Sequence, residues 1–325
     1  MLGSQVGSSA DLKAISAEVD GVLQRFLATR RGELVTIDPT LARVADELAA
    51  VVSSGGKRLR PWLATWGYRA AGGEVDASIL AAAAGLELLH TFALIQDDFM
   101  DRSDIRRGRT ATHVSLGAEL AILISDLALV WSDQLLCEAG FSGSRLSDGM
   151  RVLNQLRSEV ILGQCLDLSA TPDEQQALKV NFYKTASYTV LRPIQLGMTL
   201  AGAEPRLIAA VPAYAEAAGV AFQLRDDILG ALGQAEVTGK PDGDDLINAK
   251  PTWLWARALR LGSVPPEGVE ARREWIRSTG ALAAAEELII KLEREAREAL
   301  RRLLVAPELR AELDAVTVSL VYRET

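Results

Sequence analysis

Cysteine and histidine are scarce in this chain: its 325 residues include two cysteines, Cys137 and Cys165, and two histidines. Two cysteines make no disulfide framework, so we expect a reducing compartment and a cytoplasmic location. We expect both thiols to be buried, since free cysteine behaves as a small apolar side chain. A zinc site, which needs cysteine or clustered histidine, is disfavoured.

Targeting and partner signals are also missing. The N-terminus has no basic segment followed by an apolar core, so we expect no secretory signal. The net charge of −8 argues against nucleic acid as a partner. The longest apolar run, residues 78–96, contains Glu87 and His90, which favours a buried core helix over a membrane span.

Motifs of nucleophilic and nucleotide chemistry are absent as well. Spacing suggests no Ser-His-Asp set or Cys-His pair, and no GxxxxGK(S/T) sequence occurs. The hydrophobic content of 49% is enough for a sizeable core. The chemistry is therefore expected to reside in charged residues carried by folded, apolar segments.

Helical periodicity dominates the chain. Alanine and leucine are abundant, apolar residues recur at helical spacing, and alternating Val/Ile/Thr runs are scarce, so we predict an all-α fold. Short breaks favour a single domain over residues 11–325, preceded by a flexible head at 1–10. Helices are expected at 11–30, 40–53, 60–71, 76–103, 113–138, 146–168, 173–184, 186–202, 206–232, 250–261, 281–303 and 307–322.

Two aspartate clusters are the most informative feature: Asp97, Asp98 and Asp101, and later Asp226 and Asp227. Asp97 and Asp101 are one helical turn apart on the same face. Carboxylates this close repel each other and resist burial unless a cation joins them. Hard oxygen ligands favour magnesium. Taken alone, the first cluster is also compatible with a solvated helix end.

A basic segment precedes the first cluster. Gly55 and Gly56 let the backbone approach a ligand closely, and Lys57, Arg58 and Arg60 follow near a helix start. This combination suits a diphosphate. A surface loop with solvated charges is the alternative.

Further polar residues accompany the aspartates. His90 lies seven residues before Asp97, so both occupy nearly the same helix face. Arg106 and Arg107 either form a salt-bridge cluster or bind a second diphosphate. Downstream candidates, each weak alone, are Gln164, Asp167, Lys184, Thr185, Gln223, Lys240 and Lys250. Together these residues indicate metal-assisted departure of a diphosphate.

Six ordered motifs resemble the trans-isoprenyl diphosphate synthases, or polyprenyl synthetases: GGKRLRP, DDFMDRSDIRRG, LGQCLDL, FYKT, FQLRDD and GKPDGDDLINAKPT. The resemblance implies antiparallel helices around a central cavity and a homodimer. It also implies the reaction, in which an allylic diphosphate ionises with help from three magnesium ions. Isopentenyl diphosphate then attacks the carbocation, and the product is five carbons longer.

The resemblance assigns roles to the metal site. Asp97 and Asp101 would ligate two magnesium ions, Asp226 would ligate the third, and Asp98 and Asp227 would support them. The second acidic motif departs from the family's DDxxD because Gly230 stands in its third place. We expect activity to survive this change.

The resemblance also assigns substrate contacts. Isopentenyl diphosphate would be held by Lys57, Arg60, His90, Arg107 and, from the C-terminus, Arg323. The allylic diphosphate would be held by Arg106, Lys184, Lys240 and Lys250. The metal site and the reacting centre would be lined by Gln223, Thr185 and Gln164.

Product length is expected to depend on the residues before Asp97. Ala93, four residues upstream, lies below Asp97, and Phe92 lies about 100° further round the helix. An aromatic residue at the fifth upstream position resembles short-chain members that make a geranylgeranyl product, with a farnesyl product as the alternative. Phe92 could also be an ordinary core residue.

Two other functions stay open. A class I terpene cyclase shares the helical cavity and the aspartate motif, but it has no need of a second diphosphate site. A non-catalytic subunit of a heteromeric synthase would tend to lose the first acidic motif, which is intact here.

Overall fold

The computed structural model describes residues 3–233, 243–262 and 264–322 of the chain. These residues form two compact units. The N-terminal unit contains Val6–Met150 and Leu196–Gly202. The C-terminal unit contains the described parts of Met1–Gln5, Arg151–Gln195 and Ala203–Thr325. Each unit is described separately below.

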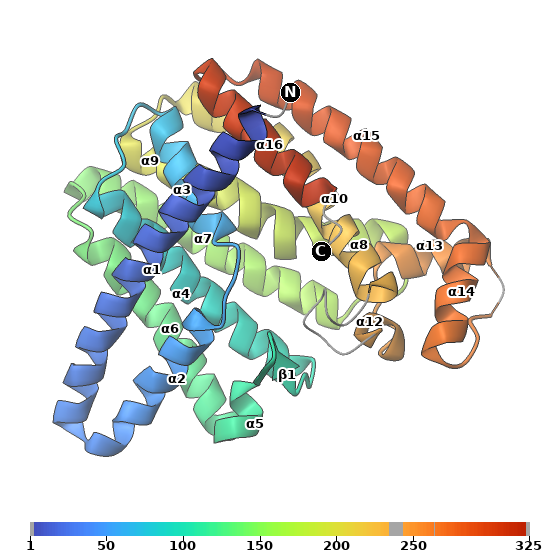
Figure 1. The fold of residues 1–325 in the computed structure, drawn as a ribbon, viewed down its shortest axis with the longest axis horizontal. Coiled ribbons are helices and arrows are strands. Elements are labelled where there is room, and N and C mark those ends of the chain that lie inside the picture. The colour runs from blue at the N-terminus through green and yellow to red at the C-terminus, as the bar shows by residue number, and fades with distance from the viewer. Residues whose placement is uncertain (1–2, 234–242, 263, 323–325) are drawn as a thin grey trace. The chain divides into compact units, whose positions relative to one another are not determined.

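The N-terminal unit is a helical bundle with one small hairpin. Helix α4 packs along α6 and against α3, as Figure 1 shows. Strands β1 and β2 pair antiparallel just after α4. The elements are α1 (Gly3–Ile37), a short 3-10 helix η1 (Pro39–Leu41), α2 (Ala42–Ser53), α3 (Leu59–Ala70), α4 (Ala77–Met100), β1 (Ile105–Arg106), β2 (Arg109–Thr110), α5 (Thr112–Leu116) and α6 (Ala118–Glu138).

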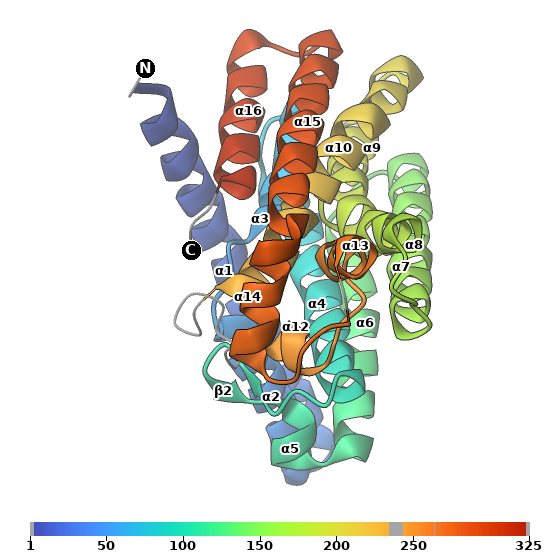
Figure 2. The same cartoon turned by 90° about the vertical axis from the view of Figure 1, so that its right-hand side faces the viewer.

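The C-terminal unit is built around α10, which packs against a π-helical segment, η2, and against α15. Helices α15 and α16 lie side by side in Figures 1 and 2. Its elements are most of α7 (Gly143–Leu168), α8 (Glu174–Val180), η2 (Asn181–Leu191), the start of α9 (Arg192–Ala201), α10 (Pro205–Leu232), α12 (Asp244–Ile247), α13 (Trp253–Leu261), α14 (Val269–Thr279), α15 (Ala281–Arg302) and α16 (Pro307–Val321).

Helix α4 positions the first acidic motif. Its start is capped by Asp76, whose carboxylate accepts hydrogen bonds from the backbone N–H groups of Ser78 and Ile79 at 2.9 and 3.1 Å. Gly85 allows α6 to come close, because a Cβ there would lie 2.9 Å from the carbonyl oxygen of Ser132. The helix ends at Met100, so the acidic motif occupies its last turn.

The all-α prediction is confirmed, and most expected helices are present. Helix α14 was not predicted, because its sequence VEARREWIRST is mostly polar and its few apolar residues, such as Trp275 and Ile276, are outnumbered by charged ones. The expected helix 113–138 is interrupted at Gly117, whose φ of 90° is incompatible with a helix. Helix α1 begins at Gly3, inside the segment predicted as a flexible head.

The expectation of buried thiols is wrong, because Cys137 and Cys165 are both exposed. Each lies on a face of its helix, α6 or α7, that carries other exposed side chains.

By length and composition alone, three of the described helices are long and apolar enough to cross a membrane, namely α4, α6 and α10. Within the fold, 67%, 44% and 50% of their most apolar windows are buried, respectively.

A buried ion pair joins three helices of the N-terminal unit. Arg58 is 7% exposed and has a left-handed backbone with φ of 46°. Its guanidinium donates to Glu87 at 2.7 Å, to Asp20 at 2.8 Å and to the carbonyl oxygen of Val52 at 2.7 Å. Glu87 is 4% exposed, so neither charge is well hydrated. The pair therefore depends on both partners being present.

We predict that Glu87→Ala destabilises the protein by ~3 kcal/mol, because it leaves the Arg58 charge buried beside one carboxylate only. The matched control is Glu138→Ala, whose carboxylate pairs with Arg30 but is 58% exposed, and we expect this change to cost less than about 1 kcal/mol. Thermal unfolding of both variants measures the difference. Equal losses of stability would contradict a structural role for the buried pair.

Candidate functional site

The last turn of α4 carries the first acidic motif, and the side chain of Arg106 pairs with two of its carboxylates. Arg106 Nη2 lies 3.1 Å from Oδ2 of Asp97, and Arg106 Nε donates to Oδ1 of Asp98 at 2.7 Å. Asp98 is 5% exposed, whereas the Asp97 side chain is 19% exposed. Asp101 is the C-cap of α4, and its N–H donates to the carbonyl oxygen of Asp97 at 2.8 Å.

The hairpin β1–β2 places Arg106 on these carboxylates. Burial lowers the pKa of Arg106, but its hydrogen bonds to Asp98 and Asp97 and their charges outweigh burial and raise it overall. The sequence left two alternatives for Arg106 and Arg107, a salt-bridge cluster or a diphosphate site. In this structure Arg106 is in a salt-bridge cluster.

The neighbouring Arg107 joins the basic segment. Its guanidinium donates to the carbonyl oxygen of Gly55. A Cβ at Gly56 would lie 3.2 Å from Nη2 of Arg107, so a residue without a side chain allows this approach. Two segments separated by about fifty residues in the chain, the Gly55–Arg60 loop and the turn after α4, are thus held together within the N-terminal unit.

His90 lies among these arginines. Burial lowers its pKa well below the usual value, and the charges of Arg60, Arg107, Arg106 and Arg58 lower it further. The ring is therefore neutral near pH 7 and can donate one hydrogen bond without adding charge. Arg60, His90 and Arg107, with Lys57 exposed on the same loop, form a cationic cluster suited to an anion.

Arg58 corrects one expectation from the sequence. The basic segment was predicted to present Lys57, Arg58 and Arg60 to a ligand, but Arg58 points into the fold and donates to protein oxygens instead. Its left-handed backbone turns the side chain inward, away from the direction of its neighbours. The other two basic residues of this segment, Lys57 and Arg60, stay candidates for contact with an anion.

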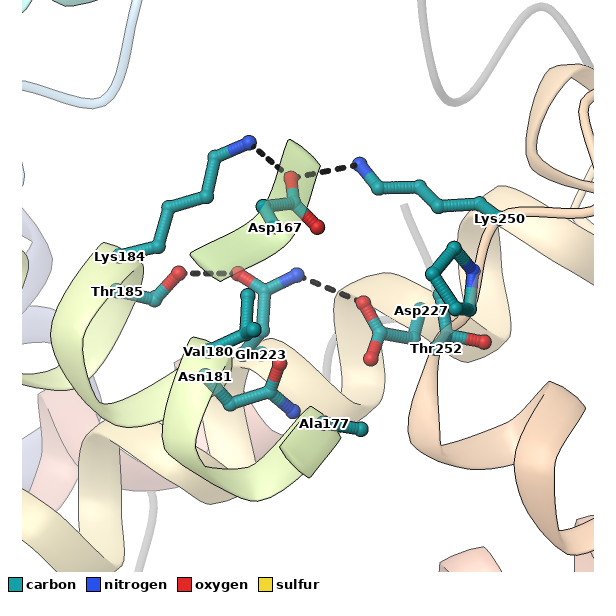
Figure 3. A pocket seen from close by; sticks show the side chains of 11 residues that line it. Asp167, Ala177, Val180, Asn181, Lys184, Thr185, Gln223, Asp227, Lys250 and Thr252 are labelled. Carbon is teal, nitrogen blue, oxygen red and sulfur yellow. Dashed lines mark hydrogen bonds and ion pairs between the residues drawn. The ribbon is translucent and has the colours of Figure 1, made fainter. Parts of the chain in front are cut away.

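The second acidic motif lies near the end of α10 and organises a polar chain (Figure 3). Gln223 donates to Oδ1 of Asp227 at 2.7 Å and accepts a hydrogen bond from the Thr185 hydroxyl at 2.5 Å. Burial raises the pKa of Asp227 to about 7, and the charge of Asp245 adds to this rise, while the Gln223 hydrogen bond opposes it. A bound cation would relieve that cost.

A second group in the same unit pairs lysines with Asp167. Lys184 Nζ lies 2.6 Å from Oδ2 of Asp167, and Lys250 Nζ lies 4.0 Å from the same oxygen (Figure 3). Asp167 was one of the downstream candidates in the sequence, but it had no specific role there. Its spacing of three residues from Gln164 places both on one helix face and was the signal that could have assigned it.

These residues line a cavity of about 60 Å³ in the C-terminal unit. Such a volume has room for an ion and a few waters rather than for a prenyl chain. Its lining comes from α7, α8, η2, α10 and the segment before α13, and consists of Asp167, Ala177, Val180, Asn181, Lys184, Thr185, Gln223, Asp227, Lys250, Pro251 and Thr252.

The π-helical segment η2 carries Lys184 and Thr185. The sequence predicted a break between helices 173–184 and 186–202, whereas the chain continues through Thr185 in a widened helix. A Cβ at Gly163 of α7 would lie 2.6 Å from the backbone nitrogen of Lys184, and a Cβ at Gly219 of α10 would overlap Ala186. Two glycines therefore let the widened segment fit between its neighbours.

The predicted site residues divide between the units. Lys240 and Arg323 lie outside the described residues, and neither Asp226 nor Gln164 is among the residues that line the cavity. The N-terminal unit carries Lys57, Arg60, His90, Phe92, Ala93, Asp97, Asp98, Asp101, Arg106 and Arg107. The C-terminal unit carries Gln164, Lys184, Thr185, Gln223, Asp226, Asp227 and Lys250.

No ready-made metal centre stands out in the part of the chain that the structure describes, where no three His, Cys, Asp or Glu side chains form one group. The hard oxygen ligands that a divalent cation prefers are supplied by aspartate carboxylates and by a diphosphate alike.

Comparison with known proteins agrees with this geometry. The model of the polyprenyl synthetase family matches residues 42–282. A geranylgeranyl diphosphate synthase of Methanosarcina mazei is 32% identical over 311 residues, which cover 92% of this chain and 93% of that protein. A short chain isoprenyl diphosphate synthase of Methanothermobacter thermautotrophicus is 34% identical over 229 residues, covering 69% and 68%.

A similar solved structure is the geranylgeranyl pyrophosphate synthase of Corynebacterium glutamicum complexed with isoprenyl diphosphate and magnesium. It aligns with a TM-score of 0.91 at 34% identity and covers 96% of this chain and 99% of that one. The family match, the relatives and the arrangement of acidic and basic residues lead to one conclusion. The chain belongs to the polyprenyl synthetase family and is a trans-prenyl diphosphate synthase.

Proposed function

We propose that this prenyltransferase condenses isopentenyl diphosphate with an allylic diphosphate and releases geranylgeranyl diphosphate. The observation that carries the proposal is the cationic cluster of Arg60, His90 and Arg107 in the same unit as the first acidic motif. An enzyme with one diphosphate substrate needs no such cluster in addition to its acidic motif. The geranylgeranyl synthases among the relatives support the product.

Magnesium fits the residues that are present. The donors are aspartate oxygens, and Asp227 is 5% exposed with a pKa raised by burial, a cost that a bound cation would relieve. In our proposal Asp97 and Asp101 hold two ions and Asp226 a third, with Asp98 and Asp227 in support. Bound magnesium supplies positive charge that stabilises the departing diphosphate.

The diphosphate of isopentenyl diphosphate is assigned to Lys57, Arg60, His90 and Arg107. The two arginines and the lysine neutralise its charge, and neutral His90 contributes a donor without further repulsion among the cations. Because Arg107 also holds Gly55, the loop and the turn would bind this anion as one preformed surface.

The allylic diphosphate is assigned to Arg106, Lys184 and Lys250, together with Lys240, which lies outside the described residues. In the structure Arg106 contacts Asp97 and Asp98, and Lys184 contacts Asp167. Binding therefore requires each cation to exchange a carboxylate for a phosphate oxygen. The carboxylates released by this exchange would need a cation, so the exchange costs least when metal ions bind together with the diphosphate.

Thr185 and Gln223 are assigned to the reacting centre. Their mutual hydrogen bond, with Asp227 at its end, fixes the Gln223 amide and the Thr185 hydroxyl in one orientation. Gln164 is placed with them by resemblance. The departing diphosphate is the proposed base for the final proton, and an apolar pocket would keep water from the carbocation.

Incubation of the purified chain with isopentenyl diphosphate and magnesium, with each allylic diphosphate primer in turn, tests this function. We expect a twenty-carbon diphosphate as the main product, sized by chromatography after removal of the phosphates. A fifteen-carbon product would favour a farnesyl synthase. Cyclic hydrocarbons from one diphosphate would favour a cyclase, and no turnover would favour a non-catalytic subunit.

Alanine variants serve as controls for that assay. Asp97→Ala and Asp101→Ala should lower kcat by on the order of 10²–10³-fold, because they remove charges that act on the leaving group. Asp227→Ala, in a supporting position, should lower it less, by about 10–100-fold. Equal losses in the three variants would contradict this ranking of roles.

Product length is assigned to Phe92 and Ala93, which precede the first acidic motif on α4. Phe92 is 5% exposed, and Ala93 is partly buried. Burial of Phe92 suits both a chain-length stop and an ordinary core position, so the two alternatives require an experiment.

We predict that Phe92→Ala yields products longer than twenty carbons, because it removes the largest side chain near the growing end. The matched control is Phe26→Ala on α1, which removes the same side chain from an edge contact with Trp131 in the same unit. Product chromatography distinguishes them. Unchanged lengths in Phe92→Ala, with folding retained, would make Phe92 a core residue only.

We also propose that the enzyme is a cytoplasmic homodimer. Helix α6 exposes Ile122 (43%), Leu123 (62%) and Val130 (51%), apolar side chains that a second copy would cover. Sedimentation should give twice the chain mass of 34.9 kDa, and Leu123→Asp should shift the protein toward the monomer. The exposed Glu138→Ala is the control, and a monomeric wild type at micromolar concentration would contradict the proposal.

A further inference from the structure

A ridge of residues on α7 runs along the widened segment η2 and the start of α9. Its members are spaced four residues apart, and they are Gln155, Glu159, Gly163 and Asp167. Residues at this spacing form one continuous ridge on a helix surface. Each member contacts a different place in the stretch that begins at Lys184 and ends at Arg192. The ridge therefore sets how η2 lies along α7.

The end of the ridge nearest the site contacts Lys184. Asp167 pairs with Nζ of Lys184 at 2.6 Å, and the close approach at Gly163 involves the Lys184 backbone. In the proposed function Lys184 leaves Asp167 for a phosphate oxygen of the allylic substrate. Of these two contacts the approach at Gly163 then remains, and a glycine offers no side chain to bind η2. During catalysis the register of η2 has to be held from elsewhere on the ridge.

Glu159, two turns away along the ridge, binds η2 and α9 together. Its Oε2 accepts hydrogen bonds from the buried hydroxyl of Ser187 and from Nε of Arg192 at 2.8 Å. Its Oε1 accepts from Nη2 of the same guanidinium, so the pair with Arg192 is bidentate. Burial raises the pKa of Glu159, but the hydrogen bonds from Arg192 and Ser187 outweigh burial and lower it overall. The carboxylate is therefore charged near pH 7.

These contacts bracket the end of the widened segment. Ser187 lies within η2, two residues beyond Thr185, and Arg192 is the first residue of α9. A π-helical turn is a rare conformation that depends on its surroundings. A slide of η2 by one residue along α7 would move both partners of Glu159 away from its carboxylate, so this one side chain opposes the slide at two points.

We propose that Glu159 is a positioning residue for the reaction, which holds η2 in register on α7 while Lys184 exchanges Asp167 for a diphosphate. This inference rests on the proposed function. Glu159 acts through Ser187 and Arg192 rather than through contact with a substrate. Its effect reaches Lys184, which is assigned to the allylic diphosphate, and Thr185, which is assigned to the reacting centre.

Steady-state kinetics of the purified full chain test this role. A residue that only stabilises the fold changes the melting temperature and the fraction of active enzyme, and it leaves both KM values unchanged. We expect Glu159→Ala to lower kcat/KM for the allylic diphosphate by about 10–100-fold, through both a higher KM and a lower kcat. The KM for isopentenyl diphosphate, whose assigned residues are in the other unit, should change by less than about threefold.

Conservative and double variants sharpen the test. Glu159→Gln keeps the length of the side chain and one acceptor oxygen, so it should retain at least about tenfold more activity than Glu159→Ala when both are folded. The double variant Glu159→Ala/Arg192→Ala should be no worse than Glu159→Ala, because both substitutions remove the same contact. Additive losses in the double variant would contradict a role that acts through Arg192.

The matched control is Glu174→Ala on α8 in the same unit. The Glu174 side chain is 20% exposed, as is that of Glu159, and it pairs with Arg257 and Arg260 of α13 instead of with η2. We expect its KM and kcat values to stay within about twofold of wild type. An equal kinetic loss in Glu174→Ala, or wild-type allylic kinetics in Glu159→Ala, would overturn the inference.

Hydrogen–deuterium exchange adds a readout that needs no turnover. With magnesium and inorganic pyrophosphate bound, peptides from residues 181–191 should exchange at least about tenfold faster in Glu159→Gln than in wild type, and peptides from α13 should not. Unchanged exchange over 181–191 would count against the inference. A wild type that makes no prenyl product contradicts the proposed function, whereas an active synthase with wild-type kinetics in Glu159→Ala contradicts this inference alone. If Glu159→Ala does not fold, Glu159→Gln takes its place.

Discussion

Charge neutralisation is the constraint on which both units depend. In each unit aspartates and basic side chains are packed too closely to be stable unless opposite charges touch. Arg106 meets this need for Asp97 and Asp98, and Lys184 meets it for Asp167. Arg58 and Glu87 do the same inside the fold, where neither reaches a ligand. One physical rule thus yields two kinds of ion pair: those that support the fold and those that lie at the proposed substrate site.

One capping residue and a few glycines position the helices that carry these ion pairs. Asp76 starts α4 so that the acidic motif falls in its last turn, and Gly85 lets α6 come close beside it. In the C-terminal unit Gly163 and Gly219 admit the widened segment η2, which presents Thr185 to Gln223. The residues without side chains are as necessary to the site as the charged ones, because they allow the backbones to approach.

Much of this was predictable from the sequence, for physical reasons. Helical periodicity predicted the all-α fold, and one-turn spacing placed Asp97 and Asp101 on one helix face. Features that depend on tertiary contacts were not predictable. The inward turn of Arg58 needs the positions of Asp20 and Glu87, and the π-helix needs two distant glycines. The few apolar residues of α14 are outnumbered by charged ones, which hid this helix in the sequence, and the exposure of Cys137 and Cys165 depends on which face each helix buries.

The pairing of Arg106 with Asp97 and Asp98 has a thermodynamic consequence. The rearrangement that makes these carboxylates available to a cation also makes the guanidinium available to an anion. Each ligand alone must break the ion pair and leave one member uncompensated, whereas the two together share that cost. At the proposed site the binding of cation and of diphosphate would therefore be coupled positively, and each would raise the affinity for the other by the same factor. The ion pair would therefore favour binding of a metal–diphosphate complex over binding of either component alone.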